Sequence, residues 1–590
     1  MKQFLITIGG VFVGLALFFV GAPLLVIAVI ASASQPAPLA GHNVLVLDLR
    51  RGLSDQDSPS PFAFFSGKAQ SVIGIEQTLR RAQDDGQVGG LLVRLPEGGM
   101  APAAADELRG AFKRFRAAGK PILVFSQGLY ADGMVPSTYE LAAASGDIWM
   151  QPAASFQVTG LARQDVFFKR FFDRHGVKAD YQQRYEYKNA VNPYLYDDYT
   201  PAHRESELGW MGSVYQTVLT SVAADRALSV AEVKARLEAG PYSAEDAKAK
   251  GLIDAVGDLR AADQAILAKA GSDAKLVGFK DYKPAATSTI GAGGTVAVIG
   301  AEGAIMTGED GAANPLGGGD TIYSDDVSKA FYAAIDDKDV KAIVFRVSSP
   351  GGSDTASEQI LSAVRAAKAA GKPVVISMGT YAASGGYWIS SQASEIVAQP
   401  TTLTGSIGVF GGKFALGEAL AKFGVDMRGV KVGGDFADAY SSTAPMTASQ
   451  TAAFSAVIDR IYGGFVDRVA SGRRLTPERV RDIAKGRVWT GEQAKTLGLV
   501  DSLGGFYDAV DRAKALAGIK GKARLRSFDA DSSPFDAMRK MVGASARVMG
   551  LMSRADAVAE APGARALTAG IGDAGLRAQG ATVLAPRWVW

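Results

Sequence analysis

The feature that most constrains the fold is an internal repeat with a period near 250 residues. The tetrapeptide AGKP occurs at residues 118–121 and again at 370–373, a shift of 252. Further along the chain, GLID at 251–254 returns as GLVD at 498–501, a shift of 247. Solenoids and propellers repeat every ~20–50 residues, so this period is too long for them. We therefore expect two tandem, diverged copies of one domain.

Each copy alternates strand-like and helix-like segments. The strands are expected at residues 43–49, 90–95, 122–125 and 342–347, and the helices at 75–83, 103–118 and 355–370. In the last of these helices, Thr355 and Glu358 have the spacing of a capping box. Strand, helix and strand at these spacings favour a parallel sheet covered by helices, which is an α/β fold.

The repeat and the composition of the flanking segments predict five parts of the chain. They are an N-terminal anchor at 1–40, a first repeat at 41–275, a linker at 276–294, a second repeat at 295–525 and an Ala/Gly/Met-rich tail at 526–590. The tail is expected to be a flexible or accessory segment, with an amphipathic membrane-surface helix as the alternative.

Residues 4–30 contain no charged side chain. A helix of this length, at about 1.5 Å per residue, spans a hydrocarbon core of about 30 Å. A cleaved signal peptide is the competing interpretation, because residues 31–33 (ASA) resemble a cleavage site, but its apolar region is usually only about 7–15 residues. We expect an uncleaved transmembrane anchor with the N-terminus inside, which places the rest of the chain across the membrane.

Composition restricts the chemistry. The chain has no cysteine, which excludes thiol catalysis, disulfides and zinc sites built on cysteine. The 63 basic and 60 acidic residues give a net charge of only +3, without a long basic run, so no nucleic-acid partner is expected. We also expect neither a cofactor nor a bound metal.

A candidate nucleophile lies where a strand gives way to a possible helix. Ser384 follows a small-residue segment after the apolar run at 374–376, and two glycines come directly after it. A nucleophilic serine needs a base and donors for an oxyanion. Gly351 and Gly352, which end the strand at 342–347, are candidate donors because glycine permits close backbone approach. The alternative is that both glycine pairs are only turns.

The two copies differ at these positions. With one inserted residue, Gly133 aligns with Ser384, so the first copy has no serine there. The segment LPEGG at 95–99 corresponds to SSPGG at 348–352 and keeps only the glycines. Both copies therefore cannot carry the same chemistry.

The base must come from elsewhere in the chain. The three histidines, His42, His175 and His203, lie in polar stretches that suggest surface or half-buried positions. Lys188 lies among aromatic and small apolar residues, and burial would lower its pKa towards the range a base requires. Local sequence leaves this choice open.

Four motifs resemble the long, duplicated form of bacterial signal peptide peptidase A. They are YEYKNAVNPY at 185–194, RVSSPGGS at 346–353, YAASGGYWIS at 381–390 and TLTGSIGVFGG at 402–412. The resemblance covers residues 1–525 and includes the anchor and the duplication. It implies a Clp/crotonase-type βαβ superhelix in each repeat and a Ser–Lys dyad divided between the repeats.

The resemblance also implies roles for individual residues. Ser384 would be the nucleophile, Lys188 the general base, Gly385 with Gly351 or Gly352 the oxyanion donors, and Ser406 a supporting residue near the lysine. The implied substrates are signal peptides left in the membrane. The implied protein is a homotetramer, anchored by a single span in the bacterial inner membrane, with its catalytic domains on the periplasmic side.

Two other functions remain possible from the sequence. A crotonase-like acyl-CoA enzyme would use a similar oxyanion hole without requiring Ser384 or Lys188. A non-catalytic membrane scaffold would require neither residue, although each copy retains one of them.

Overall fold

The computed structural model describes residues 41–56, 70–282, 293–309, 321–528 and 583–584. The predicted anchor at residues 4–30 lies outside the described residues, as do most of the linker and most of the tail. Within the described ranges, no helix combines the length and the apolar character that crossing a bilayer requires.

The first half of the chain builds a six-stranded sheet in the order β8-β4-β3-β2-β1-β9, in which all neighbouring strands run parallel. Its strands are β1 (Asn43–Asp48), β2 (Val88–Arg94), β3 (Ile122–Ser126), β4 (Ile148–Met150), β8 (Ala255–Val256) and β9 (Lys275–Gly278). The strands predicted in this half are confirmed to within a few residues.

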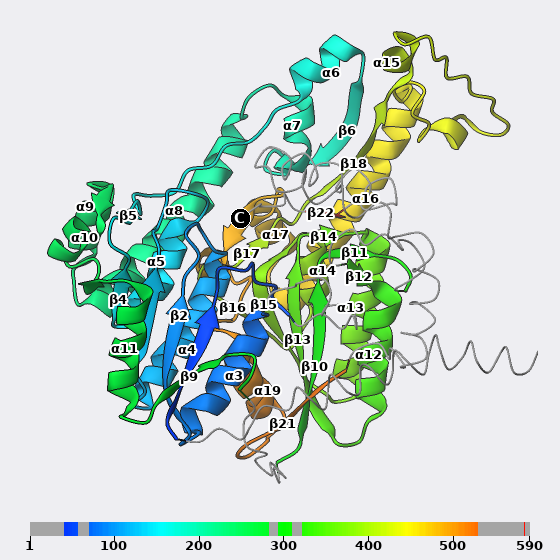
Figure 1. The fold of residues 1–590 in the computed structure, drawn as a ribbon. Coiled ribbons are helices and arrows are strands. Elements are labelled where there is room, and N and C mark those ends of the chain that lie inside the picture. The colour runs from blue at the N-terminus through cyan, green and yellow to red at the C-terminus, as the bar shows by residue number, and fades with distance from the viewer. Residues whose placement is uncertain (1–40, 57–69, 283–292, 310–320, 529–582, 585–590) are drawn as a thin grey trace, which may run out of the picture.

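The second half repeats this order as β20-β16-β15-β13-β10-β21, again with parallel neighbours. The strands are β10 (Thr295–Glu302), β13 (Val340–Ser349), β15 (Val374–Ala383), β16 (Glu395–Ala398), β20 (Ser502–Leu503) and β21 (Arg524–Ser527). The upper end of β15 also pairs with β17 (Leu403–Gly405), which is followed in the sheet by antiparallel β19 (Val488–Thr490). The expectation of an α/β fold with parallel sheets is confirmed (Figure 1).

Helices cover both faces of each sheet. In the first half, α3 (Val72–Asp84), α4 (Pro102–Ala117) and α5 (Val135–Ala143) cover one face and α11 (Leu259–Ala270) the other. In the second half, α12 (Ser324–Asp336), α13 (Asp354–Ala369) and α14 (Gly385–Ser390) cover one face and α19 (Phe506–Leu516) the other. Strands buried on both faces are typical of parallel sheets, which explains their continuous apolar sequences.

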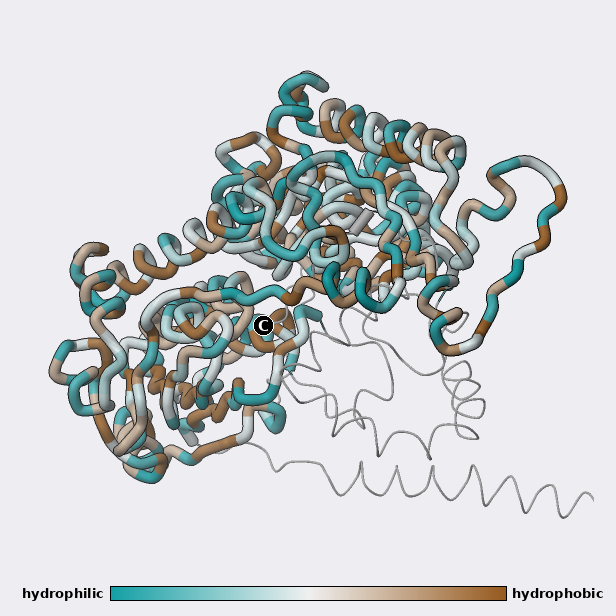
Figure 2. Tube along the Cα trace, turned by 90° about the horizontal axis from the view of Figure 1, so that it is seen from above, coloured by the Kyte–Doolittle hydropathy of each residue, from teal (hydrophilic) through white to brown (hydrophobic). Residues whose placement is uncertain are grey.

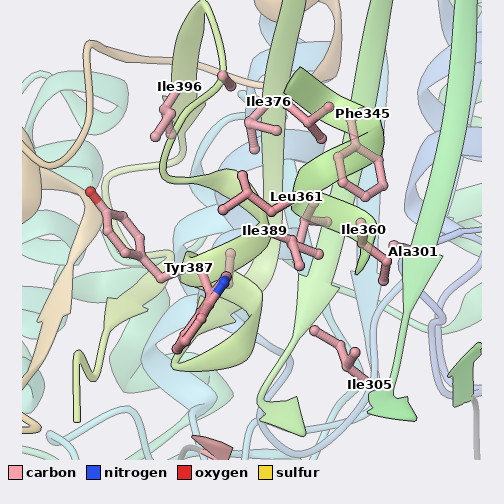
Figure 3. Packing of buried hydrophobic residues seen from close by; sticks show 14 of the residues in the cluster. Ala301, Ile305, Phe345, Ile360, Leu361, Ile376, Tyr387, Ile389 and Ile396 are labelled. Carbon is pink, nitrogen blue, oxygen red and sulfur yellow. The ribbon is translucent and has the colours of Figure 1, made fainter. Parts of the chain in front are cut away.

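The core of the second half shows this packing in detail. Phe345 and Ile376, on neighbouring strands, share one cluster with Ile360 and Leu361 of α13 (Figure 3). Val344, which directly precedes Phe345 on β13, belongs to the cluster on the opposite face, against α19. This alternation follows from the two-residue side-chain period of a strand.

Several local expectations need correction. Residues 275–278, at the boundary of the predicted linker, form the edge strand β9. The α13 helix is capped by Ser353, whose hydroxyl accepts a hydrogen bond from the N–H of Ala356, so the predicted capping box at Thr355 is wrong. The possible helix after Ser384 is short, because α14 ends at Ser390 and residues 395–398 form the strand β16.

The two halves meet across a buried cluster of charges. Arg346 of β13 binds both carboxylate oxygens of Asp55 at 2.5 and 2.9 Å and reaches Glu107 of α4 at 2.8 Å. Nearby, the hydroxyl of Thr401 donates to Asp106 at 2.7 Å. All of these side chains are buried, so pairing between the halves satisfies charges that would otherwise be costly to desolvate.

A second connection is an antiparallel ribbon. β6 (Lys178–Arg184) from the first half pairs along its whole length with β18 (Val409–Ala415) from the second half. Figure 1 shows this ribbon above the two sheets. It carries the residues that follow Arg184 towards the second half.

Candidate active site

Ser384 occupies the sharp turn between β15 and α14. Its φ of +56° lies in the left-handed region, which is strained for a residue with a side chain. Such a turn between strand and helix projects a serine hydroxyl out of the backbone, as in nucleophile elbows. The N–H of Ser384 donates to the carbonyl of Gly405 at 2.9 Å, which fixes the turn against β17.

Lys188 reaches the second half through the β6–β18 ribbon. After the ribbon, the N–H groups of Tyr185 and Tyr187 both donate to the carbonyl of Lys485 at 3.2 Å. Gly486 lies directly against Lys188, because a Cβ at this glycine would come within 2.5 Å of the lysine Cβ. The second half therefore holds the backbone on which the first half presents its lysine.

The Lys188 amine makes three close contacts. Its Nζ lies 2.8 Å from Oγ of Ser384, 3.0 Å from the carbonyl oxygen of Ser406 and 3.0 Å from Oγ of Ser406. Ser406 directly follows β17, and its own N–H donates to the carbonyl of Arg487 at 2.7 Å. The structure thus brings Ser384, Lys188 and Ser406 into one hydrogen-bonded group.

The surroundings of this group favour an uncharged amine. Ser384, Lys188 and Ser406 are all completely buried. Desolvation lowers the pKa of Lys188 well below its usual range, and among the residues that the structure describes no carboxylate raises it again. A neutral amine has one lone pair and two N–H groups, which matches three contacts if Ser384 donates to it and Ser406 accepts twice.

The glycines expected to supply donors lie on the other side of Ser384. Gly351 and Gly352 form the short strand β14, which lies against the turn: a Cβ at Gly385 would be 3.0 Å from both Cα of Gly351 and N of Gly352. The N–H of Gly351 donates to the hydroxyl of Ser349 at 3.1 Å, a contact that the sequence did not indicate.

The neighbouring N–H of Gly352 points to the edge of β14 opposite β11 (Ala304–Met306), which is the edge where β22 (Val583–Leu584) pairs antiparallel with β14. The N–H of Ser353 donates to Ile305 in β11 at 2.8 Å. Successive N–H groups of an extended strand point in opposite directions, so that of Gly352 points away from β11.

His203, by contrast, belongs to a different cluster. It is buried on α8 (Pro201–Arg226), where its Nε2 lies 3.9 Å from Asp165 and 3.8 Å from Glu207. Burial lowers its pKa to about 4. The hydrogen-bonding partner of Ser384 is therefore a lysine and not this histidine.

Comparisons with known proteins agree with this site. The sequence model of peptidase family S49 matches residues 114–273 and 366–520, one segment in each half. Protease 4 of Salmonella typhi is 37% identical over 505 residues, covering 81% of this chain and 77% of that protein. Protease 4 of Haemophilus influenzae is 32% identical over 546 residues, covering 87% and 86%.

A plant protein gives a third match. The chloroplastic serine protease SPPA of Arabidopsis thaliana is 28% identical over 487 residues, which cover 81% of this chain and 69% of that protein. The family match and the bacterial relatives both extend over most of the two halves. The chain therefore belongs to peptidase family S49 and is a serine protease.

Proposed function

We propose that this protease cleaves peptide bonds with a Ser–Lys dyad, in which Ser384 is the nucleophile and Lys188 the general base. The observation that carries the proposal is the buried 2.8 Å contact between the lysine Nζ and the serine Oγ. This distance is within the reach that proton transfer requires. Burial lowers the pKa of Lys188 well below its usual range, which favours the neutral amine whose lone pair can accept the serine proton.

Acylation would begin when Oγ of Ser384 attacks the carbonyl carbon of the scissile peptide bond. The neutral amine of Lys188 takes the hydroxyl proton as the C–O bond forms. The resulting ammonium remains hydrogen-bonded to the carbonyl and hydroxyl of Ser406. It then protonates the leaving amine, so that the C–N bond breaks and an acyl-enzyme remains.

The tetrahedral oxyanion needs donors on the side of the attacked carbonyl. We assign these to the N–H of Gly385 and the N–H of Gly352. Gly352 is favoured over Gly351 because the N–H of Gly351 already donates to Ser349, whereas the N–H of Gly352 points away from β11. Each such donor typically contributes a factor of about 10²–10³ to kcat.

Deacylation reverses the roles. Lys188, neutral again, takes a proton from water as the water oxygen attacks the ester carbonyl, and Ser384 recovers that proton when the C–Oγ bond breaks. Ser406 supports both steps by orienting the amine through two acceptors 3.0 Å away. It is a positioning residue and does not itself react.

The proposed substrates are apolar peptides, above all signal peptides left in the membrane after cleavage from their preproteins. The resemblance to bacterial signal peptide peptidase A supports this class, and so does the apolar neighbourhood of the dyad. An apolar cluster joins Val191, three residues after Lys188, to Met306 of β11 and Phe410 of β18. Apolar substrate residues that pack against apolar side chains are removed from water, which is favourable.

The proposed architecture consists of two repeats, at residues 41–275 and 295–525, of the Clp/crotonase type. The identical sheet order of the two halves supports a duplication. We further propose that residues 4–30 form a single membrane anchor in the bacterial inner membrane and that the repeats lie on the periplasmic side. The uncharged length of that segment supports this placement.

A homotetramer completes the proposal. After α15 (Gly417–Ala421), a loop extends from the body of the molecule (Figures 1 and 2). It exposes four large apolar side chains, Phe423, Val425, Val430 and Val432, of which the last two are almost fully accessible. An exposed apolar segment of this kind is typical of a contact between subunits.

The experiment that tests the function combines labelling with cleavage. A fluorophosphonate probe should acylate Ser384, and a peptide with an apolar core should be hydrolysed by the parent chain. The variants Ser384→Ala and Lys188→Ala should abolish hydrolysis while retaining the fold by circular dichroism. Hydrolysis that survives in either variant would overturn the dyad, and acyl-CoA turnover without labelling would favour a crotonase-like enzyme.

A further inference from the structure

Three side chains form a cluster at the junction of the two halves, next to the segment that carries Lys188. This junction cluster consists of Tyr187 and Glu205 from the first half and Arg487 from the second. Glu205, on α8, accepts a hydrogen bond from the Tyr187 hydroxyl at 2.9 Å and another from the Arg487 guanidinium at 2.6 Å. One carboxylate therefore joins the residue that directly precedes the base to a residue of the other half.

Ring contacts orient the same guanidinium. Arg487 lies over the ring of Tyr187, at 4.9 Å from its centroid, and over the ring of Trp489, at 4.5 Å. Only 20% of the Arg487 side chain is exposed, whereas 55% of the Glu205 side chain is exposed. An exposed ion pair alone holds its partners weakly, but a planar guanidinium that also stacks on rings is held in one orientation. The junction cluster therefore fixes Tyr187 although its carboxylate faces solvent.

The backbone of Arg487 holds the other partner of the base. Arg487 directly precedes β19, which pairs with β17, and Ser406 directly follows β17. The carbonyl of Arg487 accepts the N–H of Ser406 at 2.7 Å. The carbonyl and hydroxyl of Ser406 in turn lie 3.0 Å from the Lys188 amine. One residue thus holds Tyr187 with its side chain and Ser406 with its backbone.

Helix α8, which supplies Glu205, packs against the second half. Gly209 and Ser213 follow Glu205 at intervals of four residues, so the three lie on one face of the helix. The carbonyl of Gly209 accepts a hydrogen bond from the side chain of Gln493 at 3.3 Å, and the hydroxyl of Ser213 lies 2.8 Å from that of Thr490. The carboxylate of Glu205 therefore extends from a helix face that is already fixed to the second half.

We propose that Arg487 is a positioning residue: by holding Tyr187 and Ser406 together, it keeps the amine of the base at hydrogen-bonding distance from the nucleophile. This inference rests on the proposed function, because it takes Lys188 as the general base. The base and the nucleophile come from different halves, so a small shift between the halves would lengthen the 2.8 Å contact between Nζ of Lys188 and Oγ of Ser384. A misplacement of about 1 Å costs about 10²-fold in rate where geometry is critical.

The test compares peptide hydrolysis by Arg487→Met and by the parent chain. We expect kcat to fall about 10-fold with KM within about 2-fold of the parent, because the base is displaced. The midpoint of the pH profile of kcat/KM should rise by about one unit, because a displaced amine is better hydrated and its pKa lies closer to the usual value for lysine. Arg487→Lys keeps the charge without the planar fork, so it should restore only part of kcat.

Two further variants separate positioning from a general loss of stability. Arg512→Met is the matched control, because it removes an arginine that binds Glu395 through two contacts of 2.5 Å within the second half. Its kcat, KM and pH profile should match the parent. Glu205→Gln should lower kcat about as much as Arg487→Met does, and the double variant should lose little more, because both changes break one contact. Titration of active molecules with a fluorophosphonate corrects each kcat for chains that do not fold.

The outcomes are distinct. A lower kcat and a raised midpoint in Arg487→Met, neither of them seen in Arg512→Met, would support the inference. A kcat and a pH profile like those of the parent in Arg487→Met, beside an inactive Lys188→Met, would overturn the inference and leave the proposed function standing. Losses that multiply in the double variant would also overturn it. Hydrolysis that survives in Lys188→Met would overturn both.

Discussion

The two repeats keep the same framework but differ where the chemistry would take place. Lys120 in the first half and Lys372 in the second each donate to backbone carbonyls at the C-terminal end of a helix, α3 or α12. The helices α8 and α16 (Ala448–Arg473) have the same length, and each ends at a residue in the left-handed conformation. The two halves therefore share contacts that build the fold.

The difference lies in the turns that meet above each sheet. Gly133 has a φ of +53°, close to the +56° of Ser384, so the first repeat keeps the turn without its hydroxyl. There the N–H of Gly99 donates to the carbonyl of Asp132 at 2.9 Å. The corresponding N–H of Gly352 points instead away from β11. The buried contact between Lys188 and Ser384 joins a lysine of the first half to a serine of the second.

The largest expected effect on peptide hydrolysis comes from removing the proposed nucleophile, Ser384, which has no serine counterpart in the first half. Ser384→Ala should reduce kcat/KM for peptide hydrolysis by about 10⁴-fold or more, because the attacking oxygen is lost. Ser137 provides the matched control, since it is a buried serine on α5 of the first repeat. Ser137→Ala should leave kcat/KM within about 2-fold of the parent. A loss of similar size in both variants would contradict the assignment of the chemistry to the second repeat.

The next effect concerns the base that crosses between the repeats. Lys188→Met preserves the length of the side chain and removes the amine, so kcat/KM should fall by about 10³-fold. Lys413→Met is the control, because Lys413 is also largely buried but its amine donates to the carbonyl of Ser441. Peptide hydrolysis by the control should stay close to the parent rate. Equal losses of activity in the two variants would contradict the assignment of Lys188 as the general base.

The same lysine sets the direction of the pH dependence. Because the neutral amine is the active form, kcat/KM of the parent should rise with pH through an ionisation well below the usual range for lysine. The folded state binds the Lys188 proton less tightly than the unfolded state does, so stability should also rise with pH between the two pKa values. Thermal melts of the parent and of Lys188→Met across that range should show a smaller pH dependence in the variant.

A third comparison uses two arginines at equivalent positions, Arg94 of β2 and Arg346 of β13. Arg346→Met should lower the free energy of unfolding by about 3–5 kcal/mol, because it leaves the carboxylates of Asp55 and Glu107 buried without their cation. Arg94 is the equivalent residue of the first half, where its guanidinium donates to the side-chain carbonyl of Gln127 at 3.2 Å. Arg94→Met should cost less than about 1 kcal/mol. Denaturant titration of both variants measures this contrast, and equal costs would contradict it.

Local pattern was sufficient for the strands β1, β2, β3 and β13, for the helices α3, α4 and α13, and for the position of Ser384 after a strand, because these depend on neighbours in the sequence. The resemblance, and not the residues around it, indicated Lys188. Its environment comes from the ribbon of β6 with β18 and from Gly486, about 300 residues further along the chain. The Arg346 cluster and the pairing of β22 were missed for the same reason, since contacts between distant segments leave no periodic signal.

The smallest expected effect concerns the stability contribution of a tyrosine hydrogen bond that is present in both halves. The hydroxyl of Tyr139 donates to the carbonyl of Leu252 at 2.7 Å, and that of Tyr387 to the carbonyl of Leu499 at 2.8 Å. Both tyrosines are fully buried, and burial raises the pKa of each hydroxyl. Tyr139→Phe and Tyr387→Phe should therefore each cost about 1 kcal/mol of unfolding free energy. Costs that differ by more than about 1 kcal/mol would show that the two frameworks have diverged in energy although their geometry is the same.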